Sequence, residues 1–439
     1  MAENSRQRAK PMCKYGEKCY RKNPEHLKSF SHSLESEAEA KEDKKKPTKL
    51  FPLFEKTASI RKSREEAANS TIEKSSQAGK RQRSPSPSKK AQSSDDKRQK
   101  TEEEQGGEPS SADGQETVWL AKSANETERI SFVREQQMLE PPPDLLDAWR
   151  LAQKLRPTDP LNAFSSAHWR LCGPFDVLAG AFDEVKSLTN EDCLIHHRYP
   201  LDPPEFITVA FGKSIHVGYL RDAPKEVPRV VCSNVNTTEN GGWTKLTILG
   251  DNLFAALHAM IGEEEEASGG IGQYSSLLQA VAGAASTGGY SLDANSAKVK
   301  QRRKEVVAPT IHGAGIVVPV RDEVGYRELP ETNANLKKLI SRAADEKEDE
   351  ALRQSKMEKI QELITFVQFA NDECDYGMGL ELGLDLFACG QPSMHPQIRH
   401  LLTVAYELLG RNEWTRVLTV HLKHRFDTKD MSVLTRKRL

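Results

Sequence analysis

Aromatic residues are scarce in this chain of 439 residues, at 6%, and no apolar run approaches the ~18 residues that a helix needs to cross a bilayer. No apolar segment typical of a secretory signal peptide follows Met1. These two absences predict a soluble, intracellular protein. The formal net charge of -1 shows no excess of either sign, so the overall charge indicates neither a polyanionic nor a membrane partner.

Cysteine is sparse and unevenly spaced. The seven cysteines are Cys13, Cys19, Cys172, Cys193, Cys232, Cys374 and Cys389. An odd number at irregular spacing makes a poor disulfide framework and is typical of a reducing compartment. Only the first two are close together in the sequence.

Periodic apolar residues are almost missing from residues 34–126, which are rich in Ser, Lys, Glu, Gln and Pro. Such a segment cannot bury enough surface to offset its ordering entropy, so we predict a disordered linker there. Within it, basic clusters flank a spacer over residues 80–100, and Ser84 and Ser86 each precede a proline. The pattern indicates a nuclear import signal with phosphorylation sites. A merely solvated, charged linker is the alternative.

Regular structure is expected from about residue 130, within a core domain that we place at residues 127–439. The segment 141–155 has helical apolar spacing, with Asp144 as its expected N-cap. Residues 205–220 predict two strands about Gly212, residues 228–234 and 243–250 predict two more, and a helix should begin after Asp251 or Asn252. The expected fold class is therefore α+β, a mixed helix and strand core with helical N- and C-terminal parts.

Glycine-rich stretches raise the question of a nucleotide site. Residues 263–290 predict a charged helix end followed by a loop, because the strand, lysine and helix of a phosphate loop are missing around them. Residues 311–320 predict a turn that enters a buried strand, since they lack G-x-G-x-x-G spacing. We therefore expect no nucleotide-binding fold in this chain.

Five carboxylates lie in the apolar run FVQFANDECDYGMGLELGLDLF, residues 366–387. Apolar residues recur at spacings of three and four from Met357 to Ala370, which predicts a helix ending near Asp372 and Glu373. Leucines then alternate with other residues from 380 to 386, which predicts a strand with Glu381 and Asp385 on its polar side. Two more helices should close the core domain, over residues 398–410 and 413–426.

The adjacent pair Asp372 and Glu373 is a possible acid–base element, because neighbouring carboxylates raise one another's pKa. An exposed pair that merely ends a helix is the commoner case and remains the alternative from pattern alone. Asp375 could equally cap the turn at Tyr376 and Gly377.

The N-terminal segment carries Cys13, Cys19, His26 and His32 in the spacing C-x5-C-x6-H-x5-H. Two thiolates and two imidazoles form a closed tetrahedral set for structural Zn²⁺, which would supply most of the folding free energy of so short a segment. Residues 1–30 hold eight cations against three acids, with Tyr15, Tyr20, Arg21 and Lys22 between the ligands. Flat rings and cations suit an anionic ligand with bases to stack.

The stretch CKYGEKCYRKNPEH, followed by a second histidine, resembles the poly(ADP-ribose)-binding (PBZ-type) zinc finger, which we place at residues 1–33. The resemblance implies recognition of ADP-ribose by Tyr15, Tyr20 and Arg21. Without it, the residues indicate only a polyanion similar to a nucleic acid.

The core resembles the histone PARylation factor family over most of residues 130–425. The matching stretches are GPFDVLAG, DPPEF, HVGYLRDAP, GDNLFAA, HGAGIVVPV, VGYRELPET and FVQFANDECDYGMGLELG. The resemblance implies a nuclear accessory factor that binds the catalytic domain of a DNA-damage-activated poly(ADP-ribose) polymerase and completes its active site. Together the two would modify serines, notably on histones, using NAD held by the polymerase.

For particular residues, the resemblance implies a general base at Glu373, assisted by Asp372 and oriented by Arg327. It implies contacts with the polymerase at Tyr326, Phe369 and Asp375. The finger would hold the factor near poly(ADP-ribose) at damaged chromatin.

Two other functions stay open. The chain could be a poly(ADP-ribose)-reading adaptor whose carboxylates are only structural, or an independent ADP-ribose hydrolase using Asp372 and Glu373. The second is the weaker, because no ligand-pocket motif accompanies the two acids.

Overall fold

The computed structural model describes residues 31, 117–183, 185–236, 242–426 and 431–437, and the expected α+β class is confirmed. The helices are α3 (Glu126–Gln136), α4 (Pro143–Leu155), α5 (Pro174–Leu178), α6 (Asn190–Ile195), α7 (Leu253–Ala267), α8 (Ser275–Gly288), α9 (Ala297–Glu305), α10 (Asn333–Ala344), α11 (Glu350–Asp372), α12 (Gly377–Ala388), α13 (His395–Leu408), α14 (Glu413–His424) and α15 (Val433–Lys437). The strands are β1 (Arg170–Leu171), β2 (Phe206–Phe211), β3 (Ile215–Leu220), β4 (Val230–Val235), β5 (Thr247–Gly250), β6 (Val306–Ala308) and β7 (Ile316–Val317). The finger and most of the expected linker lie outside the described residues.

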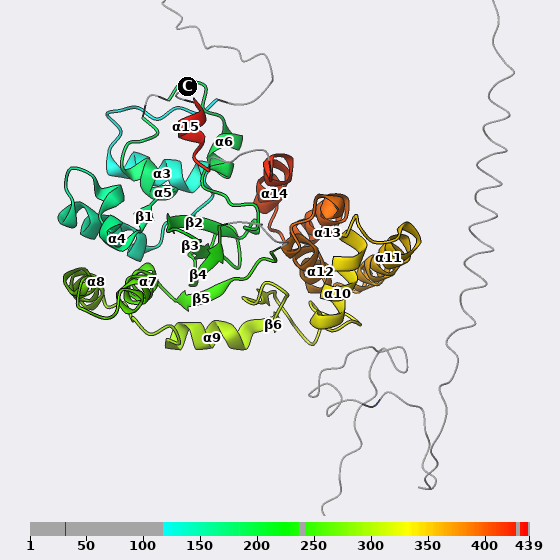
Figure 1. The fold of residues 1–439 in the computed structure, drawn as a ribbon. Coiled ribbons are helices and arrows are strands. Elements are labelled where there is room, and N and C mark those ends of the chain that lie inside the picture. The colour runs from blue at the N-terminus through cyan, green and yellow to red at the C-terminus, as the bar shows by residue number, and fades with distance from the viewer. Residues whose placement is uncertain (1–30, 32–116, 184, 237–241, 427–430, 438–439) are drawn as a thin grey trace, which may run out of the picture. The chain divides into compact units, whose positions relative to one another are not determined.

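Strands β1 to β5 form an antiparallel sheet in chain order, and β6 pairs with β7 separately. Strands β2 and β3 join through a tight turn, in which the Gly212 N–H donates to the Ile215 carbonyl (2.9 Å). Five of the six residues of β2 are buried, because helices cover the sheet on both sides (Figure 1). The four strands predicted between residues 205 and 250 are thus confirmed.

Two large hydrophobic clusters and a smaller one, between the sheet and α9, lie among the described residues. The first joins the sheet with α3, α4, α5, α7 and α8, and the second joins α10 to α14. In Figure 1 the second group of helices lies to one side of the sheet, with α12 next to α13. The predicted helices from Met357 to Ala370 and near the C-terminus correspond to α11, α13 and α14.

Helix α12 occupies the centre of the second cluster, and all twelve of its residues are buried. A Cβ atom on Gly379 would lie 3.1 Å from Val367 of α11, and one on Gly383 would lie 2.6 Å from Leu402 of α13. These glycines therefore let α11 and α13 approach α12 closely. The strand predicted here is wrong. Residues two apart lie about 200° apart around a helix, so alternating leucines cover opposite sides of α12, both of which are buried.

Two further predictions are corrected. The loop expected before Tyr290 contains helix α8, whose small residues give little periodic signal. Asp144 does not cap its own helix, which begins after Pro142; instead Asp144 Oδ2 accepts the N–H of Leu253, the first residue of α7 (2.7 Å), and the hydroxyl of Tyr219 (2.8 Å). The predicted start of α7 is confirmed, with Asn252 as its N-cap.

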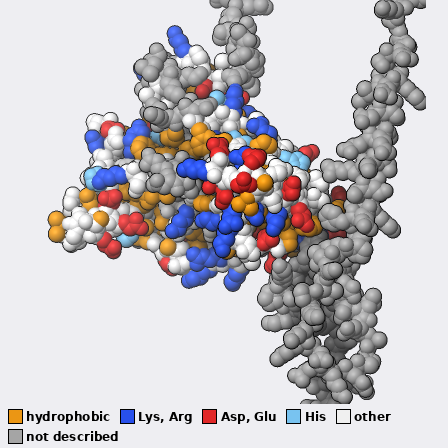
Figure 2. Space-filling model, turned by 45° about the vertical axis from the view of Figure 1, so that its right-hand side comes forward, with side chains coloured by type: hydrophobic (Ala, Val, Ile, Leu, Met, Phe, Trp, Pro, Cys, Tyr) orange, Lys and Arg blue, Asp and Glu red, His pale blue; other side chains and the backbone are white. Residues whose placement is uncertain are grey.

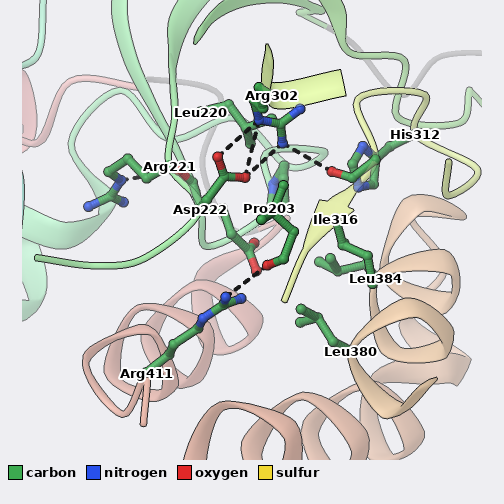
Figure 3. A pocket seen from close by; sticks show the side chains of 13 residues that line it. Pro203, Leu220, Arg221, Asp222, Arg302, His312, Ile316, Leu380, Leu384 and Arg411 are labelled. Carbon is green, nitrogen blue, oxygen red and sulfur yellow. Dashed lines mark hydrogen bonds and ion pairs between the residues drawn. The ribbon is translucent and has the colours of Figure 1, made fainter. Parts of the chain in front are cut away.

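Buried polar contacts join the sheet region to the second cluster. The Tyr406 hydroxyl donates to Glu205 Oε1 (2.7 Å), and Arg411 donates to the Val317 carbonyl (2.8 Å). Between them is a cavity of about 20 Å³, towards which Leu380 and Leu384 of α12 point (Figure 3). A cavity of this size has room for a single water molecule. Helix α12 is therefore enclosed on the sheet side as well.

Within the described residues, no helix combines the length and apolar character that crossing a membrane requires.

Gly383→Ala should unfold more easily than Gly262→Ala. Both replacements add a methyl group within a helix and gain up to about 1 kcal/mol in helix propensity. Only the methyl group at 383 meets a neighbour, since nothing lies within 4 Å of a Cβ at Gly262. Overpacking of a buried site costs about 1–3 kcal/mol, and this should separate the free energies of unfolding of the two variants, measured by urea denaturation. Equal stabilisation of both would contradict the close approach of α12 and α13.

Candidate functional site

Helix α11 ends at the predicted pair of acids with a Schellman motif. The Asp375 N–H donates to the Ala370 carbonyl (2.8 Å) and the Cys374 N–H to the Asn371 carbonyl (3.0 Å). Cys374 takes the left-handed position at φ 63°, where glycine is usual and other residues are strained. The turn brings Glu373 to the surface and directs Asp375 into the interior. Two acids that are two positions apart in the sequence therefore differ in exposure to solvent.

Arg327 joins these two acids from a segment 46 residues earlier. Its Nη2 atom pairs with Glu373 Oε2 and lies 2.9 Å from Asp375 Oδ2. The side chain of Arg327 is 4% exposed and that of Asp375 is fully buried, whereas that of Glu373 is 40% exposed. The guanidinium therefore holds Glu373 from the protein side and leaves the rest of the carboxylate open to solvent.

Asp375 also fixes the segment that carries Arg327. The Gly325 N–H donates to Asp375 Oδ1 (2.9 Å), and the Gly377 N–H donates to the Gly325 carbonyl (2.9 Å). Gly325 has φ 130° and a Cβ there would lie 2.1 Å from the Pro319 carbonyl oxygen, so the position requires glycine. Asp375 therefore positions Arg327. Its side chain is fully buried and exposes no surface with which to contact a partner directly.

The two expected surface aromatic residues have different surroundings. Phe369 is 53% exposed and precedes Glu373 by four residues, so both side chains project from the same face of α11. Tyr326 is half-buried and donates its hydroxyl to Glu381 Oε2 (2.9 Å). Asp372 is exposed, and no ion pair of its side chain is found in the described part of the chain.

Glu381 and Asp385 lie one turn apart in α12 and are buried, so their placement on the polar side of a strand is wrong. Burial, and then the charge of Asp385, raise the pKa of Glu381 to about 8. Burial raises the pKa of Asp385 to about 7, although its Oδ1 accepts the Ile311 N–H (2.7 Å). Glu381 fixes the segment of Tyr326 and Arg327, and Asp385 fixes the earlier segment at Ile311. No local signal in the sequence predicted this role.

The surface around the helices is electrostatically mixed. Side chains of both signs share the face drawn in Figure 2, with hydrophobic side chains between them. A partner would therefore be selected by local contacts more than by a field of one sign.

Two family models and several known proteins are similar to this chain. The family model described as "Histone PARylation factor 1" matches residues 127–425, and the one described as "PBZ domain" matches residues 10–34. Histone PARylation factor 1 of Mus musculus is 41% identical over 292 residues, covering 65% of this chain and 83% of the relative. Those of Bos taurus (41% over 294 residues, 65% and 83%) and Danio rerio (40% over 292 residues, 65% and 82%) are similar.

The core thus defines a PARylation-factor domain preceded by a zinc finger of the PBZ class. The chain belongs to the histone PARylation factor family. The predicted finger residues lie within the PBZ match but outside the described residues. They are Cys13, Cys19, His26, His32, Tyr15, Tyr20 and Arg21. Within the matched segment, the structure describes Ser31 alone.

Arg327→Met should destabilise the fold by about 3–5 kcal/mol, because it leaves the buried carboxylate of Asp375 without its counter-charge. Glu373→Gln removes the other half of the same contact, yet should change stability by less than about 1 kcal/mol, because its side chain is 40% exposed. Urea denaturation of the two variants checks the contrast. Equal losses would contradict the one-sided burial of the ion pair.

Stability should fall as the pH rises from 6 to 8. The folded-state pKa values of Glu381 and Asp385 exceed those of the unfolded chain, so the folded protein binds more protons in this window and loses stability as they dissociate. Between pH 6 and pH 8, the Glu381→Gln/Asp385→Asn double variant should lose less free energy of unfolding than the unmodified chain, with a difference on the order of 2 kcal/mol. Urea denaturation at the two pH values measures both losses. Burial lowers the pKa of His312 to about 3, so this histidine makes stability rise with pH below about pH 6. The unmodified chain and the double variant share His312, so its effect is the same in both. If the free energies of unfolding of the two proteins change with pH in the same way, Glu381 and Asp385 are not protonated in the folded state.

Proposed function

We propose that this chain is an accessory factor for histone PARylation, which binds a DNA-damage-activated poly(ADP-ribose) polymerase and lends it Glu373 as a general base. One observation carries the proposal: a carboxylate open to solvent is fixed from the protein side by a buried arginine. Membership of the histone PARylation factor family supports the substrate class. The base then acts on a serine hydroxyl of the acceptor protein.

The chemistry needs a base at that position. A serine hydroxyl is a weak nucleophile at neutral pH, and a positioned carboxylate accelerates its attack about 10²–10⁴-fold. As the serine oxygen bonds to the anomeric carbon of NAD, nicotinamide leaves and the hydroxyl proton passes to Glu373. NAD is bound by the polymerase, so the chain alone catalyses nothing. Arg327 orients the carboxylate, and Asp372 assists at the edge of the site.

The surroundings of Glu373 suit a protein–protein contact. Phe369 is about half exposed and lies one turn before Glu373, and exposed aromatic residues are frequent anchors of interfaces. Tyr326 lies on the segment that holds Arg327, with its hydroxyl fixed by Glu381. Asp375 contributes by holding Gly325 and Arg327 in place. Docking of the polymerase over Phe369 and Tyr326 would enclose Glu373 beside the acceptor serine.

The N-terminal segment adds a second attachment. The donor set of Cys13, Cys19, His26 and His32 fits one tetrahedral Zn²⁺, and the segment matches the PBZ domain. With Tyr15, Tyr20 and Arg21 it would bind poly(ADP-ribose), and the basic linker would direct the chain to the nucleus. Attachment to polymer already made at damaged chromatin raises the local concentration of the core.

Glu373→Gln should abolish serine ADP-ribosylation of histones by the purified polymerase with NAD, lowering the initial rate at least about 10²-fold. The variant keeps the shape of the side chain, so binding to the polymerase should be retained. Glu362→Gln, on an exposed position of the same helix, is the matched control and should act as the unmodified chain does. Modified residue types are mapped by mass spectrometry.

If Glu373→Gln still supports serine modification at the normal rate, the carboxylate is not the base. Retained recruitment to poly(ADP-ribose) in that case would favour the adaptor function, to which the PBZ match points. Release of ADP-ribose by the chain alone would instead indicate a hydrolase.

A further inference from the structure

A second polar cluster lies far along the chain from Glu373, where α5 meets the end of α6. Asp176 of α5, His196 and His197 each offer one ligand atom, and these atoms all lie within 4.8 Å of one another. Their side chains are 4%, 0% and 6% exposed. The proposed function uses none of them, so the cluster needs its own explanation.

The spacing of the ligand atoms fits a small cation. Asp176 Oδ2 is hydrogen-bonded to His196 Nε2 (2.9 Å) and lies 3.7 Å from His197 Nε2. Ligands about 2.0–2.1 Å from a tetrahedral zinc ion lie ~3.4 Å apart, a value between the two observed distances. All three ligand atoms lie within 4.8 Å of one another, so side-chain rotation that breaks the hydrogen bond between Asp176 and His196 would place them on one ion.

In the described part of the chain, three of the four ring nitrogens of the two histidines lack the partners that buried polar atoms normally have, and the fourth, His196 Nε2, is hydrogen-bonded to Asp176. Within the described residues, both ring nitrogens of His197 and Nδ1 of His196 are buried without a hydrogen-bond partner. One of the two ring nitrogens of a neutral imidazole carries a lone pair that can accept a hydrogen bond or bind a metal. Neutral imidazole is the form that binds metals.

The backbone holds His197 in this position. His197 has φ 52°, a left-handed conformation that residues other than glycine rarely take, and its N–H donates to the Met431 carbonyl (2.7 Å). Its ring stacks on Phe211 of β2 at 5.3 Å, while the His196 ring contacts Phe182 edge-on. Strained backbone conformations of this kind are concentrated at functional sites, and this one carries a ring that lies beside a buried carboxylate.

We propose that Asp176, His196 and His197 bind a Zn²⁺ ion, which links α5 to the end of α6. Two imidazoles and one carboxylate form a common zinc set, with a fourth position for water. Asp176 Oδ2 also accepts the Gly173 N–H (2.7 Å), a hydrogen bond of the kind that orients ligating carboxylates. Arg170 lies 3.6 Å from Asp176 Oδ1 and competes electrostatically with the ion.

The test uses the full chain with the finger disabled by Cys13→Ser and Cys19→Ser, so that finger zinc is not counted. After incubation with Zn²⁺ and gel filtration, this variant should retain one zinc ion per chain by inductively coupled plasma mass spectrometry. Adding His197→Phe should remove that ion, while His258→Phe, a half-buried histidine of α7, should not. Phenylalanine fills the space of the imidazole without polar atoms, and circular dichroism checks folding.

Arg170→Gln in the same background gives a second measurement that does not depend on deleting a ligand. Removing the competing cation should tighten Zn²⁺ binding severalfold in a chelator competition titration. If the finger-disabled chain retains no zinc, or keeps its zinc after His197→Phe, the site does not exist and the cluster is a structural hydrogen-bond group.

Discussion

The contact of Arg327 with Glu373 and Asp375 is the constraint on which the rest of the site depends. One guanidinium bridges a carboxylate at the surface and a carboxylate in the interior. The buried carboxylate also accepts the Gly325 N–H, which fixes the segment that carries the arginine. The loop and the end of α11 therefore hold each other in place. Because Glu373 follows the last turn of a helix, where the dipole is unfavourable for an anion, the guanidinium also offsets an electrostatic cost.

The acids of α12 extend this support into the interior. Glu381 accepts a hydrogen bond from the Tyr326 hydroxyl, and Asp385 accepts one from the Ile311 N–H. Two loops are therefore attached to one buried helix. Their raised pKa values mean that burial favours the protonated forms near neutral pH. A neutral acid satisfies loop groups without placing more negative charge near the Arg327 cluster. The packing of α12 between α11 and α13 thus contributes to the geometry of a surface site.

Two kinds of sequence signal predicted much of the fold. Helix α11 was found because burial of one face leaves a periodic pattern, and strands β2 to β5 were found from runs of β-branched and aromatic residues between turn residues. Helix α12 was missed because every face is buried, so its leucines satisfy a period of two as well as a helix. Asp144 was misassigned for another reason: its oxygen caps α7, whose first residue is 109 positions away, and no local rule describes such a contact.

The site could be predicted only in part, for the same reason. Periodicity placed Glu373 at a helix end, but Arg327 is 46 residues away and its pairing needs the folded chain. The role proposed for the carboxylate came from the family resemblance, because an exposed acid has no pattern that separates a base from solvated charge. In the proposed function, Glu373 acts on a substrate held by another protein and so has to stay accessible, which leaves its own fold one side on which to contact it. The buried arginine contacts Glu373 on that side, and the exposed side is left for the proposed partner.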